Sequence, residues 1–505
     1  MLAVAAVLVG VLARTGGAFV YTLDDPYIHL ALAEEIARGG YGVNPDAFAA
    51  PSSSVLWPFL LSLWVRLPGS DIVPFAINVT AGLATIGVYV SVLEWALRPA
   101  SARRAWAIIG VAATGAMLAT NLVGIAFTGM EHSLQVFLAV AGVWGLWLER
   151  DTGNVPAWLL PALVLGPLVR YENLAVSGAA LLYLFVRGHR RSAMGGGIAL
   201  AVVLGGFSAF LASNGGAWLP SSVLAKSKLD DGPGGLLGGI LANLRDSQGR
   251  MLSLVAVPLL AACLADRRDW TERLFAAAVL LMVALHFVGG DFGWLSRYEI
   301  YVTAAALVGL TVLYGDALRR VVGRGTWLQA AVVGALAVCL YGFRYVGGLG
   351  QLPGASANIY EQHVQLHRFV TQHYAAPVAV NDLGWMSYRN DGFVLDLYGL
   401  GSYEALRLRT SRADHDWITP LADRHRVKLA MVYDAWFPDF PADWIRLGTL
   451  YRTGPRISAG ANEVAFYARD AGTAQRAHGA LRAWAEGLPP GTGFDPAPAS
   501  GPRSR

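Results

Sequence analysis

Two adjacent carboxylates, Asp24 and Asp25, follow the first apolar stretch of the chain and precede Pro26. A carboxylate in this position could act as a general base that takes a proton from a substrate hydroxyl. The two residues could instead serve only the next helix, because Asp is a favoured N-cap and Pro a favoured first helical residue. We expect Asp25 to be that N-cap, with Pro26 at the first helical position. Asp24 is then the freer candidate for chemistry.

Two further groups of polar residues stand beside apolar stretches. Glu131 and His132 begin one apolar run, and Arg170 and Glu172 separate two short ones. Charged groups in apolar surroundings are costly unless they pair or line a polar cavity. Glu131 could simply favour the N-terminus of its helix, His132 could be packed, and Arg170 could pair internally with Glu172. The alternative is that all four contact a substrate.

Two more turns add cations and another acid. Lys226 and Lys228 follow residue 219 closely, and Asp291 comes after two glycines and shortly before Arg297. Lysine binds phosphate as a point charge, and arginine binds it through two parallel hydrogen bonds. Ordinary surface lysines and a capped turn would give the same pattern. The chain has no GxxxxGK[ST] loop for a nucleotide, so a sugar donor would have to arrive on a membrane carrier.

The elements that position these residues belong to a membrane protein. Hydrophobic residues make up 55% of the 505 residues and charged residues only 15%, against roughly 25% charged in soluble domains. This composition excludes a disordered chain and argues against a purely soluble enzyme. The net charge of +4 does not suit a nucleic-acid-binding protein. The two cysteines, Cys263 and Cys339, lie in apolar runs and form no disulfide framework.

A bilayer core requires a helix of about 20 mainly apolar residues, and about eleven stretches meet that description. They are residues 2–20, 72–97, 105–122, 130–148, 157–169, 173–187, 194–212, 251–265, 272–289, 299–315 and 327–346.

Arginine-rich loops set the expected orientation, because positively charged loops stay in the cytoplasm. These loops are residues 98–104, 149–156, 187–193, 266–273 and 316–326. All five fall on one side only if residues 52–67, which are apolar but short, form an interfacial helix that does not cross. The first loop (21–71), with an amphipathic surface helix at 27–38, then lies outside, together with the other candidate site residues and the chain after about residue 350.

The last part of the chain alternates strands and helices. Strands are predicted at 377–380, 393–397 and 428–433, and helices near 360–374 and 411–426. We therefore expect a membrane module over residues 1–348 and an extracytoplasmic α/β domain over 349–487. Residues 488–505, which are rich in Ala, Gly and Pro, are expected to be disordered.

The ordered set of motifs resembles the GT-C superfamily of polytopic membrane glycosyltransferases, above all the bacterial (mycobacterial-type) terminal arabinofuranosyltransferases. The matching segments are residues 24–28, 44–45, 52–57, 128–131, 170–172, 219–226, 289–297, 380–384 and 395–400. The resemblance covers most of the chain. It implies an α-helical GT-C fold of about eleven transmembrane helices in the inner (plasma) membrane, with an extracytoplasmic α/β domain.

The resemblance also implies an inverting glycosyl transfer. The donor would be a sugar of the arabinofuranose or mannose type on polyprenyl phosphate, and the acceptor would be a cell-envelope glycan. Asp24 or Asp25 would be the general base. The α/β domain would help to hold the glycan, with Trp385 or Trp436 stacking on its sugar rings.

Further residues are expected to surround the substrates. Because some members of the superfamily hold a divalent cation, Asp24, Glu131 and Asp291 are candidate ligands for Mg, Mn or Ca. The two lysines and Arg297 would hold the lipid phosphate. The residues expected to contact substrate are Tyr27, Glu131, His132, Arg170, Glu172, Lys226, Lys228, Asp291 and Arg297.

A transporter (flippase) for a lipid-linked sugar is the competing interpretation from another class of protein. Transporters carry charges near the middle of the membrane and often contain internal repeats. Here the charges gather at one face, and the sequence has no convincing repeat. A non-catalytic scaffold would leave the paired aspartates, Arg170 and Asp291 without a purpose. We therefore predict a glycosyltransferase and keep the flippase as the alternative.

Overall fold

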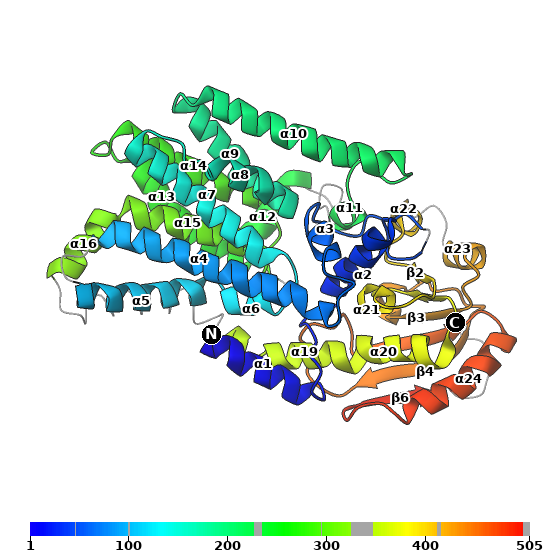
Figure 1. The fold of residues 1–505 in the computed structure, drawn as a ribbon. Coiled ribbons are helices and arrows are strands. Elements are labelled where there is room, and N and C mark those ends of the chain that lie inside the picture. The colour runs from blue at the N-terminus through cyan, green and yellow to red at the C-terminus, as the bar shows by residue number, and fades with distance from the viewer. Residues whose placement is uncertain are drawn as a thin grey trace.

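The computed structural model describes residues 1–45, 47–98, 102–226, 235–293, 295–324, 347–411 and 416–497. A bundle of helices is followed by a small sheet domain that lies beside one end of the bundle (Figure 1). This is the order of helices and sheet that the sequence predicts.

Helices occupy ten of the eleven positions predicted for membrane spans. They are α1 (Leu2–Arg14), α4 (Val73–Leu97), α5 (Ala102–Ala119), α7 (His132–Thr152), α8 (Leu159–Val169), α9 (Leu174–Val186), α10 (Arg190–Ser213), α13 (Ser247–Leu264), α14 (Trp270–Gly289) and α15 (Ile300–Leu313). The remaining position, residues 327–346, lies outside the described residues. Four described helices are long and apolar enough to cross a membrane: Ser70–Leu97, which includes α4, and α10, α13 and α14.

Helix α7 forms the centre of the bundle. Its Val136, Ala139, Val140, Val143 and Leu146 are all fully buried, at the spacing of three and four residues that forms one helical face. They pack into a continuous apolar core with residues of α4, α8, α9, α14 and α15. The outer helices, in contrast, expose large apolar side chains. Such an exterior suits contact with lipid.

The predicted arginine loops meet at one end of the bundle, the end far from the sheet domain (Figure 1). Nη2 of Arg150 lies 2.6 Å from Oδ2 of Asp269, and Nη2 of Arg187 lies 3.2 Å from Oε1 of Glu149. Nη1 of Arg268 donates to the carbonyl of Leu313 (2.9 Å). The expectation of a shared end is confirmed for the loops 149–156, 187–193 and 266–273, whereas residues 99–101 and 325–326 of the other two loops lie outside the described residues.

The first loop begins and ends at the opposite end of the bundle. The hydroxyl of Tyr21 donates to the carbonyl of Asp71 (2.7 Å) and accepts from the backbone N–H of Phe75 (3.0 Å). The start of the first loop therefore lies beside its end and beside the start of α4. Between them stand α2 (Asp25–Arg38) and the short α3 (Trp57–Ser62). Residues 52–67 therefore do not cross the bundle, as predicted.

The expectation that residues 27–38 lie along the surface is wrong. Most of the first half of α2 is buried, including Ile28, Leu30 and Leu32. The reason is that the sheet domain covers the face of α2 that the bundle leaves open, so that one apolar core joins α2, α3 and the sheet. The sequence of α2 alone gives no sign of this second partner.

The sheet has six strands in the order β2-β1-β3-β5-β4-β6. Strands β1 (Val378–Val380), β2 (Val394–Asp396) and β3 (Leu429–Val432) are parallel to one another, and β5 (Glu463–Ala468), β4 (Ile445–Arg452) and β6 (Thr492–Pro496) pair antiparallel. The three predicted strands are confirmed, whereas β4, β5 and β6 were not predicted.

Helices cover both faces of this sheet. Val378 and Val380 of β1 point to the face packed by α2, by the long helical segment 352–374, which begins with α19 (Leu352–Ile359) and includes α20 (Gln365–Arg368), and by α24 (Ala471–Ala485). Ala379 points to the other face, which packs against α22 (Tyr403–Ser411) and α23 (Ile418–Arg424). Alternation of this kind is the period of a strand.

The expectation of a disordered tail from residue 488 is wrong for residues 492–496. They form β6, which pairs with β4 from Gly448 to Arg452. Phe494 supplies the reason, because its ring packs 5.3 Å from that of Phe466 and 5.9 Å from that of Trp484. One aromatic anchor thus orders a segment that is otherwise rich in Gly and Pro. Residues 498–505 lie outside the described residues.

Candidate functional site

The adjacent aspartates of the first loop face different partners. Asp25 is the first residue of α2, and Nη2 of Arg297, which precedes α15, lies 2.7 Å from its Oδ2. The Arg297 side chain is 2% exposed and that of Asp25 is 30% exposed. Asp25 is therefore an accessible carboxylate held in place by a buried cation.

Asp24, rather than Asp25, is the N-cap of α2, and Pro26 is the second helical residue. Asp24 also has partners outside its own helix. Its two carboxylate oxygens accept hydrogen bonds from the backbone N–H groups of Gly384 (2.7 Å) and Trp385 (2.9 Å), at the start of the short helix α21 (Gly384–Ser387). A carboxylate at the N-terminus of a helix is favourable, so Asp24 connects the first loop to the sheet domain.

A histidine and a second acid surround Asp24. Nε2 of His363 lies 3.1 Å from Oδ2 of Asp382. Burial raises the pKa of Asp24 to about 6 against the lowering effect of His363, and Asp382 adds to the rise. Burial lowers the pKa of His363, but the neighbouring Asp24 and Asp382 outweigh it, and the pKa is raised overall. The sequence gives no sign of this role for His363, because Asp24 lies far away from it in the chain.

Arg170 is the hub of a second charged cluster. Nη1 of Arg170 donates to Oε1 of Glu131 (2.7 Å), and its Nε and Nη2 bind the two oxygens of Glu172 (3.1 and 2.5 Å). Nη1 also donates to the hydroxyl of Ser53 (3.3 Å). The Glu131 side chain is completely buried, and its Oε2 lies 3.7 Å from Nε2 of His29. The pairing of Arg170 with Glu172 agrees with one of the two interpretations of the sequence, and the pairing with Glu131 adds to it.

Tyr298 joins the two clusters. The guanidinium carbon of Arg297 lies 4.9 Å from the centre of the Tyr298 ring and that of Arg170 lies 5.8 Å from it. Nη2 of Arg297 also donates to the Tyr298 hydroxyl (2.9 Å). The ring of His132 meets the Tyr298 ring edge-on at 6.1 Å, and its Nδ1 lies 3.1 Å from Oε1 of Gln135. Tyr298 is therefore in contact with both buried arginines of the site.

A cavity of about 490 Å³ opens beside these clusters. Arg170, Glu172 and Tyr298 form its charged and aromatic wall, and Asp291 also lines it. Leu285 and Val288, near the end of α14, form an apolar part of the lining. The cavity thus connects polar groups with the end of a helix that is long and apolar enough to cross a membrane, an arrangement that suits a ligand with a charged head and an apolar tail.

The structure places the other predicted site residues differently. Tyr27 is 1% exposed. Its hydroxyl accepts from the N–H of Tyr21 (3.1 Å), and its ring lies 4.2 Å from that of Trp385. It is therefore a core residue and does not line the cavity. Trp385 is packed against it, whereas Trp436 is 41% exposed. The side chain of Lys226 and the whole of Lys228 lie outside the described part of the chain.

The three acids proposed as metal ligands do not form a metal site in the described structure. The oxygens of Asp24 accept backbone hydrogen bonds from the sheet domain, and Glu131 binds Arg170. Within the described ranges, no group of three or more His, Cys, Asp or Glu side chains could hold a metal ion. We derive no step through a metal.

Some contributions to the site were missed by the sequence analysis. Ser53, Asn243 and Tyr298 line the cavity, and Ser53 and Tyr298 also contact Arg170. Tyr298 could have been noticed because it follows Arg297 directly. Asn243 has no such signal, since its position beside the cavity depends on how α12 (Gly235–Arg245) packs against α13 and α14.

Comparisons of the sequence with known families match one part of the chain. A profile described as a domain of unknown function (DUF8728) matches residues 357–467, which lie in the sheet domain. No curated protein matches the sequence significantly.

Solved structures resemble the whole chain at low sequence identity. ArnT from Cupriavidus metallidurans in the apo state has a TM-score of 0.54 and 13% identity, over 94% of this chain and 98% of that one. The same protein bound to undecaprenyl phosphate gives 0.52 and 12%, over 93% and 98%. An oligosaccharyltransferase from Archaeoglobus fulgidus, solved with zinc and sulfate, has a TM-score of only 0.44 at 10% identity, over 98% of this chain and 75% of that one, which is too low to support an argument. The chain is therefore a polytopic membrane protein with the GT-C type of fold and a C-terminal α/β domain.

Proposed function

We propose that this protein is a membrane glycosyltransferase that moves a sugar from a polyprenyl-phosphate donor to a hydroxyl of a cell-envelope glycan. One observation carries the proposal. Nε and Nη1 of Arg297 are buried and have no hydrogen-bond partner among the described residues, while Nη2 binds Asp25. Buried donors without partners are rare and costly, and an arginine in this state is suited to bind a phosphate.

The donor lies in the cavity of about 490 Å³. Its lipid chain follows the apolar side chains at the end of α14. Its phosphate binds Arg297, which does not itself line the cavity but contacts the lining residue Tyr298, and Lys226 and Lys228 are further candidates. That ArnT has been solved with undecaprenyl phosphate supports a carrier of this class. The sugar is of the arabinofuranose or mannose type.

Asp25 is the general base in this proposal. Its carboxylate takes the proton of the acceptor hydroxyl, the hydroxyl oxygen bonds to the anomeric carbon, and the bond from that carbon to the phosphate oxygen breaks with inversion. Arg297 orients Asp25 before the reaction and stabilises the charge that develops on the leaving phosphate. Arg170 does not bind the donor directly, because its guanidinium is paired with Glu131 and Glu172. Its role is to keep the charged wall of the cavity in place.

Asp24 has a positioning role, since both of its oxygens bind the sheet domain. We place the site and the sheet domain on the extracytoplasmic face of the inner membrane. The arginine loops at the far end of the bundle support this orientation.

The test is an assay of the detergent-purified protein with a panel of radiolabelled polyprenyl-phosphate sugars and an envelope glycan. The wild type is expected to transfer label to the glycan or to release free sugar slowly. Asp25→Asn should reduce both rates by at least about 10²-fold, the usual loss of a general base, with unchanged thermal unfolding. Binding of the donor by the wild type without any turnover would instead favour the flippase.

A further inference from the structure

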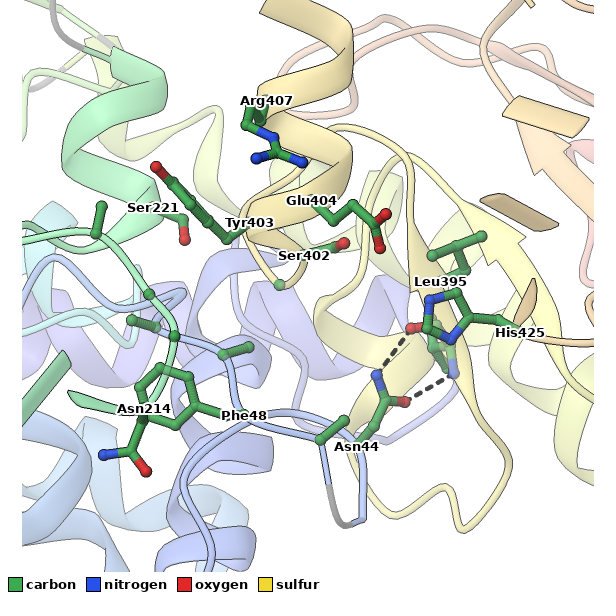
Figure 2. Close-up of a pocket in the computed structure, with 18 of the residues that line it drawn as sticks. Asn44, Phe48, Asn214, Ser221, Leu395, Ser402, Tyr403, Glu404, Arg407 and His425 are labelled. Atoms are coloured by element: carbon green, nitrogen blue, oxygen red, sulfur yellow. Dashed lines mark hydrogen bonds between the residues drawn. The ribbon is translucent and has the colours of Figure 1, made fainter. Parts of the chain in front are cut away.

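A second cavity, of about 380 Å³, lies between the membrane bundle and the sheet domain. Three parts of the chain form it: the first loop near Asn44 and Phe48, the connection from α10 to α11 (Ser221–Lys226), and α22 of the sheet domain. Figure 2 shows Tyr403, Glu404 and Arg407 on one side of this cavity and Asn44 and Asn214 on the other. We call it the upper cavity and the cavity beside Arg170 the donor cavity.

One thin wall separates the two cavities. Ala49 and Ala50 line the upper cavity, and Ser53, three residues further along, lines the donor cavity. A second segment of the chain also forms part of this wall, because Ser221 lines the upper cavity and Ser222 lines the donor cavity. The backbone N–H of Ser221 donates to the carbonyl of Ala50 (3.0 Å) and joins the two segments. A ligand in the upper cavity therefore lies directly behind the wall of the donor cavity.

The lining of the upper cavity does not suit a lipid chain. Among the described residues that line it, only those around Asn214, at the C-terminal end of α10, adjoin a helix long and apolar enough to cross a membrane. The remaining lining comes from loops and from the sheet domain. An occupant of this cavity therefore need not extend along a membrane helix.

The polar side chains of the upper cavity suit a carbohydrate. Tyr403 is 37% exposed and offers a ring with an apolar face and a hydroxyl, which is a combination that contacts both the C–H face and the hydroxyls of a sugar ring. Arg407 is exposed and has no carboxylate partner among the described residues, so its guanidinium is free to donate to hydroxyl oxygens. Glu404, whose carboxylate binds Arg424, adds an acceptor.

The floor of the upper cavity is held rigidly. The side-chain amide of Asn44 donates to the carbonyl of Val394 (2.9 Å), and its oxygen accepts from the N–H of the same residue (2.7 Å), as Figure 2 shows by dashed lines. This pair of bonds fixes the first loop to the edge strand β2. A cavity whose two sides are joined in this way is formed before its ligand arrives.

We propose that the upper cavity is a binding subsite for the acceptor glycan, which holds sugar units remote from the reacting hydroxyl. Tyr403 stacks on one sugar ring, and Arg407 donates hydrogen bonds to the hydroxyls of the next. This inference rests on the proposed function. It identifies the acceptor as an oligosaccharide of several units rather than a single sugar, because the subsite lies beyond the wall of the donor cavity.

The test uses synthetic arabinofuranosyl and mannosyl oligosaccharides of two and six units as acceptors. Tyr403→Ala and Arg407→Gln are each expected to raise the KM for the six-unit acceptor by about tenfold, the effect of one lost contact of ordinary strength. The KM for the two-unit acceptor and the rate of donor hydrolysis should stay unchanged. Arg482→Gln is the matched control for Arg407→Gln, since Arg482 is likewise an exposed arginine on a helix of the sheet domain, α24, and does not line the cavity.

Three results would overturn the inference while leaving the proposed function intact: unchanged KM values in both variants, equal increases for short and long acceptors, or an equal selective increase in the control Arg482→Gln. If the wild type turns over no donor, the proposed function fails. Saturation-transfer NMR of the six-unit oligosaccharide then tests glycan binding in the upper cavity separately. A binding signal that is lost in Tyr403→Ala supports a glycan site there, and a signal that is unchanged in Tyr403→Ala rejects that site.

Discussion

Asp25 and Arg297 are 272 residues apart in the sequence, and 2.7 Å separates Oδ2 of the first from Nη2 of the second. The pair joins the start of α2 to the turn before α15. It also places Asp25, whose side chain is 30% exposed, in contact with an arginine that has further buried donors.

Replacing this arginine by lysine should separate phosphate binding from folding. Arg297→Lys keeps the positive charge beside Asp25 but loses the planar set of donors. We expect the KM for the donor to rise by at least about tenfold, which corresponds to one lost charge-assisted contact, while thermal unfolding changes little. Kinetics at several donor concentrations measure this. An unchanged KM would mean that Arg297 does not touch the donor.

The Arg170 cluster should matter for stability. Arg170→Met leaves Glu131, whose side chain has no exposure, without its cation. We expect a loss of about 3–5 kcal/mol in the free energy of unfolding, as for other broken buried ion pairs, read as a lower unfolding temperature in detergent. Arg38→Met is the control, because Arg38 is half exposed in its pair with Glu35 and should cost at most about 1 kcal/mol. Equal shifts in both variants would show that the cluster is not buried in solution.

Gly384 should be intolerant of a side chain. A Cβ at this position would lie 2.1 Å from the backbone oxygen of Asp24 and 2.6 Å from its Oδ2. Gly384→Ala should therefore loosen the sheet domain from the first loop, and hydrogen exchange of α21 and α2 should accelerate. Gly479→Ala is the matched control, since it lies in α24 with open space around it and should be neutral or slightly stabilising. Unchanged exchange in Gly384→Ala would contradict the observed contact.

The stability of the wild type should depend on pH through Asp24. Its pKa is raised by burial from 3.8 in the unfolded chain to about 6, so the folded state favours the protonated acid. The resulting stabilisation is fully present below the unfolded pKa and is lost as the pH rises through about 6. His363, whose pKa is also raised, changes stability in the same direction.

The difference in unfolding temperature between the wild type and Asp24→Asn reports the titration of Asp24 together with the part of the His363 shift that Asp24 causes. We expect the wild type to lose stability relative to the variant as the pH rises from about 4 to about 7. A difference that stays constant over this range would show that Asp24 does not titrate with a raised pKa.

The sequence predicts the elements of this protein better than the contacts between them. Apolar length places the bundle helices, and arginine loops place their common end, because both signals are local. Strand β6 was not predicted, because Phe494 orders it only by packing against Phe466 and Trp484, which are near it in the fold. The roles of Asp24 and Asp25 were assigned the wrong way round as helix caps, since the partner of Asp24 is more than 350 residues away.

The placement of two neighbouring aspartates on two different partners has a mechanical consequence. Asp24 is fastened to the sheet domain and Asp25 to the turn before α15, and their Cα atoms can be only about 3.8 Å apart. Because this spacing is fixed, a sheet domain that shifts while it stays bound to Asp24 also displaces Asp25 relative to Arg297. The two residues therefore couple the position of the sheet domain to that of the Asp25 carboxylate, through a single peptide bond.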